Sequence, residues 1–268
     1  MKIIRPLVIF LLLSAPLLGY EIDAGRSLGM GGTIMLTAPS ATDLLLDPVA
    51  LNPDRQALIE SGYQRRYDLP ELEKGYFAAG YRRGSFSFAL GASQFGKDDY
   101  YSEKILRTSI GYYYRFIGFA IVGSGKSTKF GNNYGSFSAN SIGLAGALNY
   151  KEYHLAIVAD NLNDPKLVKN GKTDPFNVKV LTEVKGSKSF SVTGKMGIEK
   201  NQKLSLSLGQ YIFVSGKNVI YWGLSGNPLT YGGGLELSYS KFVINYSVNY
   251  HPALGISHTI SLGAAFRP

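Results

Sequence analysis

The sequence predicts an all-β protein: a transmembrane antiparallel β-barrel of about fourteen strands, with an N-terminal segment that plugs it. Three observations predict this class. Apolar and polar residues alternate with a period of two from about residue 57 to residue 266. Charged residues make up only 18% of the 268 residues, whereas the 32 glycines exceed the usual share. Beyond the N-terminus no apolar stretch approaches the roughly 20 residues of a spanning helix, so embedding in a membrane would require a closed barrel.

Residues 1–19 have the order of a secretory signal peptide. Lys2 and Arg5 precede an apolar run over residues 7–13, and small residues follow as far as Gly19. We expect cleavage near residue 19 or 20, which leaves 26 basic and 19 acidic residues and lowers the net charge from +9 to +7. A permanent membrane anchor is the alternative, but the apolar run is shorter than a spanning helix.

The next segment, residues 20–55, is expected to occupy part of the barrel lumen. A barrel of about fourteen strands is wider than an eight-stranded barrel, whose interior side chains can fill, and narrower than the 16- to 18-stranded barrels that leave an aqueous channel. Gly29, Gly31 and Gly32 would let the backbone approach the wall closely, because glycine has no Cβ atom. We therefore predict that this segment packs inside the barrel.

A short helix is expected within this segment, over residues 44–46. Ser40 or Thr42 would cap its N-terminus, and Pro48 would prevent it from continuing. The alternative for residues 20–55 as a whole is a periplasmic tail with a glycine-rich turn, because chain termini are often poorly ordered.

The remaining region, residues 56–268, is predicted to form the barrel. Strands are expected to begin near residues 57, 73, 85, 104, 117, 137, 152, 176, 188, 202, 218, 229, 242 and 256. The span from residue 57 to residue 266 holds 210 residues, or 15 for each strand with its connection. This spacing suits membrane strands of roughly 9 to 11 residues, each followed by a turn.

The predicted connections alternate in length through the first half of the chain. Tight turns fall near residues 83–84, 116, 151 and 186–187, and longer connections fall at residues 67–72, 97–103, 126–136 and 161–175. Short periplasmic turns that alternate with longer external loops are typical of bacterial outer-membrane barrels. A soluble sandwich or propeller also has short alternating strands, but it gives no reason for one-sided loop lengths.

Two terminal motifs resemble a known group. Residues 24–33 (AGRSLGMGGT) and 47–51 (DPVAL) resemble the opening of the PorV/PorQ and FadL-like outer-membrane proteins, and residues 251–262 (HPALGISHTISL) resemble the closing hairpin of that group. The chain departs from the pattern where Asp47 replaces the usual Asn and where two residues follow the terminal aromatic Phe266. The motif positions are Gly29, Met30, Gly31, Gly32, Asp47 and Pro48 near the N-terminus, and His251, Leu254, Gly255, His258 and Phe266 near the C-terminus.

This resemblance implies a fourteen-stranded barrel in the outer membrane with an N-terminal segment inside it. It also implies one of two roles: uptake of hydrophobic small molecules, as in FadL-like proteins, or assistance to protein secretion, as in PorV and PorQ. We expect passive transport of hydrophobic or amphipathic small molecules, with a secretion or surface-assembly platform as the alternative and a soluble binding domain third. Outer-membrane lipids and lipopolysaccharide would surround the barrel.

Basic residues concentrate between residues 166 and 203, a stretch that contains nine lysines and only three acidic residues. Three of these lysines alternate with apolar neighbours and should point into the lumen, and three lie in the longest predicted external loop. They are, respectively, Lys179, Lys185 and Lys195, and Lys166, Lys169 and Lys172. A basic lumen wall and loop would attract anionic headgroups or solutes. Ordinary solvated lysines are the alternative.

Motifs for catalysis and cofactors are weak, so no enzyme activity and no cofactor are expected. Residues 120–127 (AIVGSGKS) imitate a phosphate-binding loop, but the following residues are a poor helix start, and the loop needs a helix N-terminus to hold phosphate. The three histidines lack metal-ligand spacing, and there is no cysteine. We expect no nucleotide, nucleic acid or metal as a ligand.

Overall fold

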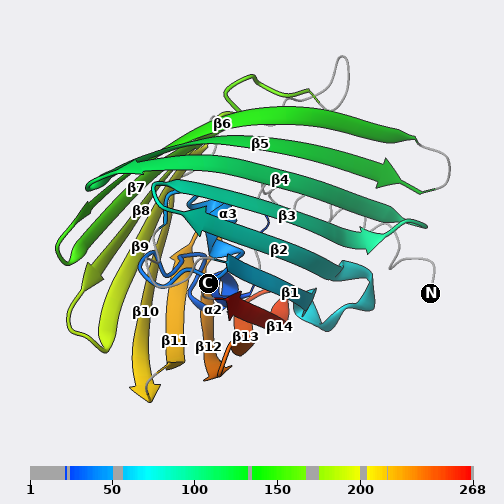
Figure 1. The fold of residues 1–268 in the computed structure, drawn as a ribbon. Helices are drawn as coiled ribbons and strands as arrows, with labels where there is room; N and C mark the ends of the chain where they lie inside the picture. Colours follow the sequence, from blue (N-terminus) through cyan, green and yellow to red (C-terminus); the bar gives the residue numbers. More distant parts are fainter. Residues whose placement is uncertain are drawn as a thin grey trace.

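A computed structural model of the chain is a closed barrel of fourteen antiparallel strands (Figure 1). It describes residue 22 and residues 25–50, 57–131, 135–166, 175–199, 204–215 and 217–266. The predicted signal peptide, Lys169 and Lys172 lie outside the described residues. Each strand pairs with its neighbours in sequence, and the first and last strands pair with each other from Ala57↔Phe266 to Arg65↔His258. The predicted all-β barrel of about fourteen strands is therefore confirmed.

The predicted strand starts lie within three residues of the observed ones. The strands are β1 (Ala57–Arg65), β2 (Glu73–Arg83), β3 (Phe86–Lys97), β4 (Tyr101–Tyr114), β5 (Ile117–Phe130), β6 (Ser136–Tyr150), β7 (Tyr153–Asp160), β8 (Asn177–Lys185), β9 (Phe190–Glu199), β10 (Ser205–Ser215), β11 (Asn218–Gly226), β12 (Thr230–Tyr239), β13 (Phe242–His251) and β14 (Gly255–Phe266). The short helices are α2 (Arg26–Gly29), α3 (Asp43–Leu46), η1 (Arg66–Asp68) and η2 (Pro70–Leu72).

The two ends of the barrel differ in the length of their connections. At the end that holds Ala57 and Phe266, five of the six connections have two residues and the sixth has four. At the opposite end the connections have between three and sixteen residues. This asymmetry, together with the even strand number, is the pattern of outer-membrane barrels, in which the short turns face the periplasm. We therefore call the two ends the periplasmic end and the external end.

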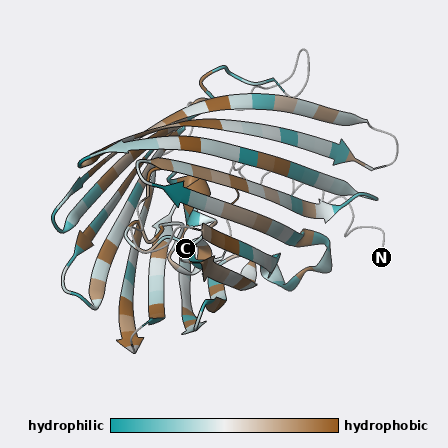
Figure 2. Cartoon of the chain, viewed as in Figure 1, coloured by the Kyte–Doolittle hydropathy of each residue, from teal (hydrophilic) through white to brown (hydrophobic). Residues whose placement is uncertain are grey.

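The outer face of the barrel is apolar, because side chains alternate between the two faces along each strand. In β5, Phe119 and Ile121 are 64% and 63% exposed, whereas Ala120 and Val122 between and beside them are buried. Figure 2 shows the resulting alternation of hydrophobic and paler residues along the strands. An apolar surface this extensive suits lipid rather than water.

Aromatic side chains gather on the outer face near the periplasmic end. They are Phe86, Tyr112, Tyr114, Phe116, Tyr150, Tyr153, Tyr239 and Phe242, each of them exposed. Such a girdle is typical of the boundary between hydrocarbon and headgroups. Within the described part of the chain, no helix is long and apolar enough to span a bilayer.

A charge placed within this apolar band should destabilise the barrel in lipid. Replacing Ile121 by Arg should lower the free energy of unfolding in liposomes by about 2–4 kcal/mol, because the side chain would face hydrocarbon. Ser136→Arg, at the external end of β6, is the control and should cost at most about 1 kcal/mol. Equal losses for the two variants in urea unfolding would contradict a lipid-facing band.

Candidate functional site: the N-terminal segment and the lumen

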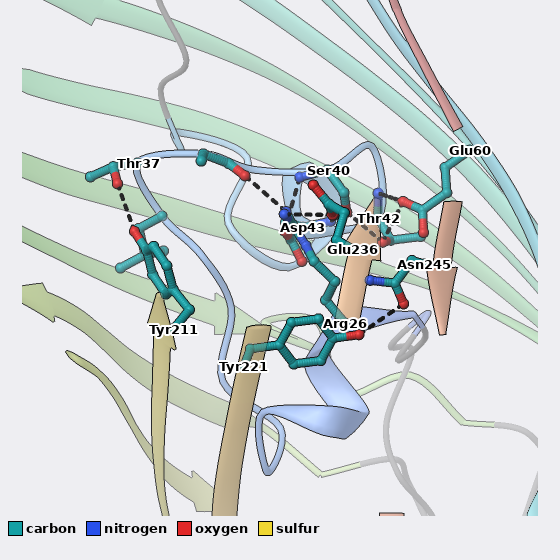
Figure 3. A network of polar contacts seen from close by, with 12 residues as sticks. Arg26, Thr37, Ser40, Thr42, Asp43, Glu60, Tyr211, Tyr221, Glu236 and Asn245 are labelled. Carbon is teal, nitrogen blue, oxygen red and sulfur yellow. Dashed lines mark hydrogen bonds and ion pairs between the residues drawn. The ribbon is translucent and has the colours of Figure 1, made fainter. Parts of the chain in front are cut away.

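The N-terminal segment, defined here as residues 25–50, lies against the inner wall of the barrel (Figures 1 and 3). None of its residues is exposed. Its polar contacts reach inward-facing side chains of strands far apart around the wall, including β1, β4, β8 and β12. Helix α2 packs against β11, β12 and β13, and α3 against β3 and β4. The wall thus contacts the segment from several sides.

The short helix predicted within the segment is confirmed as α3, which ends at Leu46 before Pro48. The hydroxyl of Ser40 accepts a hydrogen bond of 3.3 Å from the backbone N–H of Asp43, close to the helix start. The hydroxyl of Thr42 does not cap the helix and instead donates to Glu60 of β1 at 2.9 Å. The Ser40 hydroxyl therefore contacts the start of the helix, and the Thr42 hydroxyl contacts the wall.

Arg26 is the charged centre of the contact with β12 (Figure 3). It is 2% exposed, pairs with Glu236 at 3.0 Å and with Asp43 of its own segment, and donates to the backbone carbonyl of Ala38 at 2.8 Å. Burial lowers the pKa of Arg26, but the carboxylates of Glu236 and Asp43 outweigh this and raise it overall. Arg26 therefore stays charged, and the two carboxylates balance a cation that is removed from water.

Glu183 of β8 makes a second attachment. Its carboxylate accepts hydrogen bonds from the backbone N–H groups of Leu36 at 2.6 Å and Thr37 at 3.1 Å. It also accepts from the hydroxyls of Thr37 and Tyr211, each at 2.5 Å. Four donors around one buried carboxylate replace the water that it would otherwise bind, so the charge is compensated without a cation.

The third attachment lies near the periplasmic end, where the segment leads toward β1. Asp47 is fully buried, and its carboxylate lies 3.1 Å from Nε2 of His154 in β7. The hydroxyl of Ser87 donates to the carbonyl of Pro48 at 3.2 Å, and the hydroxyl of Tyr113 donates to the carbonyl of Val49. The motif residues Asp47 and Pro48 are therefore placed where the segment meets β3, β4 and β7.

Glycines on both sides allow α2 to approach the wall closely. A Cβ atom on Gly29 would lie 2.5 Å from the ring of Tyr221, and one on Gly31 would lie 2.5 Å from the backbone of Leu224. On the wall, a Cβ atom on Gly232 would lie 2.6 Å from the carbonyl oxygen of Gly29. Gly32 differs, because its nearest neighbours would lie 3.8 Å away, but its φ of +89° itself favours glycine.

Met30, between these glycines, is fully buried. It belongs to an apolar cluster with Met35, Tyr211, Val219 and Tyr221. Unbranched methionine side chains adapt to irregular gaps. The residues of the N-terminal motif thus combine close backbone approach with an apolar anchor against β10 and β11.

The lumen wall beyond the segment carries buried ion pairs. Asp160 lies 2.8 Å from Arg107 and 2.9 Å from Lys179, and Glu103 lies 3.0 Å from Lys126. Arg107 also donates to the carbonyl of Leu45 at 2.9 Å, which joins these pairs to the segment. This part of the lumen is therefore polar and carries both basic and acidic side chains.

The six candidate lysines lie in different environments. Lys179 points inward and pairs with Asp160, which also pairs with Arg107. Lys195 is partly buried beside Gly32 on the inner face. Lys185, at the periplasmic end of β8, and Lys166, after β7, are exposed. The inner wall therefore carries paired lysines together with acidic groups.

The closing hairpin motif forms the connection between β13 and β14. Nδ1 of His251 accepts hydrogen bonds from the backbone N–H groups of Ala253 and Leu254, each at 3.2 Å, and Gly255 has a φ of +96° that favours glycine. His258 faces outward and stacks on Tyr246, with 2.8 Å between its Nδ1 and the Tyr246 hydroxyl. Phe266 is the last residue of β14, and Lys241 lies over its ring at 5.5 Å. These residues shape the hairpin and the barrel seam.

Residues 120–127, which imitate a phosphate-binding loop, lie within β5 and do not open a helix. Lys126, the residue that would hold phosphate in such a loop, points inward to Glu103. In the described ranges, no group of three or more His, Asp or Glu side chains is arranged to hold a metal ion.

The wall carboxylates were missed by the sequence analysis. Glu60, Glu183 and Glu236 are single acidic residues at inward positions of strands β1, β8 and β12. An acidic residue on the face of a strand that points into a lumen was the available signal. Asp160 carried the same signal in β7, and Arg107 is a basic residue at an inward position of β4.

Comparison with known proteins supports the fold. No protein-family model matches the sequence, and no curated protein matches it. The toluene transporter TbuX of Ralstonia pickettii matches 93% of this chain and 100% of its own, with a TM-score of 0.67 and 10% identity. The fold is that of an outer-membrane barrel. The toluene transporter TodX of P. putida (93% and 99% covered, TM-score 0.62, 12% identity) and the outer membrane protein Omp33 of Acinetobacter baumannii (79% and 98%, 0.55, 7%) are also similar.

Loss of the Arg26 cation should loosen the N-terminal segment. Arg26→Met leaves Asp43 and Glu236 buried without a counter-charge, which should cost about 3–5 kcal/mol and make residues 25–50 sensitive to protease in the intact barrel. Adding Asp43→Asn and Glu236→Gln to the same chain should restore part of the resistance, because the uncompensated charges disappear. Equal cleavage of Arg26→Met and the unaltered chain would show that the ion pairs do not hold the segment.

The close approach at Gly31 can be separated from its backbone conformation. Gly31→Ala and Gly32→Ala both place a side chain at positive φ, but only the first meets backbone at 2.5 Å. We expect Gly31→Ala to lower the denaturant midpoint more than Gly32→Ala does. Equal midpoints would mean that conformation alone explains the glycines.

Proposed function

We propose that this chain is a passive outer-membrane transporter of hydrophobic or amphipathic small molecules, and that residues 25–50 act as its plug. The observation that carries the proposal is the set of hydrogen bonds and ion pairs between residues 25–50 and inward-facing side chains of the wall. TbuX and TodX, which share the fold, are toluene transporters, and this likeness supports the same class of solute. The signal peptide predicted for residues 1–19 is consistent with export to the outer membrane.

The polar attachments suit a plug that moves. A hydrogen bond to a charged group contributes about 1.5–3 kcal/mol net, less than it would in an apolar medium, because water can replace the partner. The attachments at Glu60 and Glu183 are of this kind, so the segment could leave them when water enters the lumen. Displacement of the segment would open a path along the wall.

In this proposal the described arrangement is the closed state. The cavity beside Arg26 and Glu236 has a volume of about 30 Å³, which is room for no more than about two water molecules. A toluene-sized solute needs more room. Passage near this point therefore requires the segment to shift.

A reversible crosslink tests this function. The hydroxyl oxygens of Thr33 in the segment and Thr193 in β9 lie 2.7 Å apart, and the chain has no cysteine of its own. Thr33→Cys with Thr193→Cys should form a disulfide on oxidation and reduce uptake of an amphipathic fluorescent solute into proteoliposomes to the protein-free rate. A thiol reductant should restore uptake, because the segment is then free to move.

Each single cysteine variant serves as the control and should transport under both conditions. If the oxidised double variant transports as fast as the reduced one, the segment is not a moving plug. If the unaltered chain never exceeds the protein-free rate, the transport function is wrong and a PorV/PorQ-like platform becomes the better explanation.

A further inference from the structure

The outer surface of β2–β6 carries a depression toward the external end. Its volume is about 610 Å³, within the range of roughly 300–1,000 Å³ that small-molecule sites occupy. The lining includes Phe77 and Leu106, which are 45% and 52% exposed and therefore belong to the outer face. The depression opens onto the lipid-facing side of the wall, and its lining also includes the buried residues Tyr76, Ser93, Ile105 and Lys126.

The strand register arranges the outward lining residues in two adjacent rows. The row nearer the periplasmic end is mainly apolar, and the row nearer the external end is mainly polar. The first row is Phe77, Ala92, Leu106, Gly125 and Asn140, and the second is Gly75, Gln94, Lys104, Ser127 and Ser138. The depression is therefore amphipathic along the direction that leads out of the membrane.

Small residues create the depression. The outward positions of β5 change from Phe119 and Ile121 to Gly123, Gly125 and Ser127 as the strand runs toward the external end. A Cβ atom on Gly75 of β2 would have no heavy atom within 4 Å, and one on Gly125 would meet only the side chain of Asn140, at 3.2 Å. The wall leaves this space open without any strain that would require glycine.

Two lysines give the external rim a positive charge. Lys104 and Lys129 are 55% and 53% exposed, and their ammonium groups lie 3.8 Å and 3.9 Å from the single carboxylate of Asp98. Such exposed pairs at this distance are weak. Two cations that share one anion leave a net charge of +1 to attract an anionic group.

We propose that this depression binds one phosphorylated lipid of the outer leaflet. An acyl chain lies against Phe77 and Leu106, and the phosphate is held by Lys104 and Lys129. The order of apolar and polar rows matches the orientation of a membrane lipid, and basic side chains near the membrane surface favour anionic headgroups. The position on the lipid-facing wall selects a lipid over a soluble anion. This proposal is independent of transport through the lumen.

The test uses the full chain in detergent micelles and counts bound lipid by native mass spectrometry. The probes are dimyristoyl phosphatidic acid, dimyristoyl phosphatidylcholine with the same chains, and inorganic phosphate. We expect one retained phosphatidic acid per chain, weaker retention of phosphatidylcholine, and no displacement by inorganic phosphate. Lys104→Gln with Lys129→Gln should weaken retention about tenfold or more, because each lysine near a membrane surface contributes about 1 kcal/mol.

A second variant tests the cavity itself. Gly75→Leu should fill the depression and abolish retention. Gly146→Leu is the matched control, because it adds the same bulk to the outer face of β6, where a Cβ atom would lie 3.9 Å from its nearest neighbour. Lys241→Gln, near the periplasmic end, is the matched charge control. Heat-modifiable gel mobility verifies that every variant folds.

Four results would overturn the proposal. If the double lysine variant retains as much lipid as the unaltered chain, Lys104 and Lys129 do not bind the headgroup. If Gly75→Leu does so, the depression does not hold the lipid. Displacement by inorganic phosphate would indicate a simple anion site. A dimer that Gly75→Leu dissociates would show that a second copy of the chain occupies the depression.

Discussion

The arrangement inside the barrel depends on buried carboxylates of the wall that accept hydrogen bonds from the N-terminal segment. Glu60, Glu183 and Glu236 stand on strands β1, β8 and β12, so they hold the segment from separate directions. Each carboxylate would be costly to bury alone, and the segment would leave its own backbone N–H groups unpaired without them. The wall and the segment therefore satisfy each other, and neither set of groups is stable in this position without the other.

Besides these polar contacts, glycines allow the N-terminal segment to pack closely against the wall. Gly29 and Gly31 bring α2 against the wall, and Gly232 provides a matching recess in β12. Gly31 meets the backbone of Leu224 and Gly232 meets the backbone of Gly29, whereas Gly29 itself lies against the ring of Tyr221. Glycines thus set how closely the segment approaches β11 and β12, and the ion pair between Arg26 and Glu236 adds a charged contact with β12.

The sequence shows the strands more clearly than it shows their interior partners. The period-two pattern predicted strand starts within three residues of the observed ones. This is because each strand separates lipid from lumen, and successive side chains along it point to opposite faces. The same parity placed Lys179 on the inner face. Its pairing with Asp160 on the adjacent strand could not be predicted, because the sixteen-residue connection between β7 and β8 leaves the register of these two strands open in the sequence. Arg26 and Glu236 lie 210 residues apart, and no local pattern records such a contact.

The seam between β1 and β14 has a consequence for incomplete chains. It joins nine residue pairs between the two ends of the barrel sequence, whereas every other strand pairs with its immediate neighbours in the chain. A chain that ends before residue 255 would lack β14 and would leave two strand edges open. In hydrocarbon each unpaired backbone group costs several kcal/mol, so the last dozen described residues decide whether the whole wall can exist in a membrane.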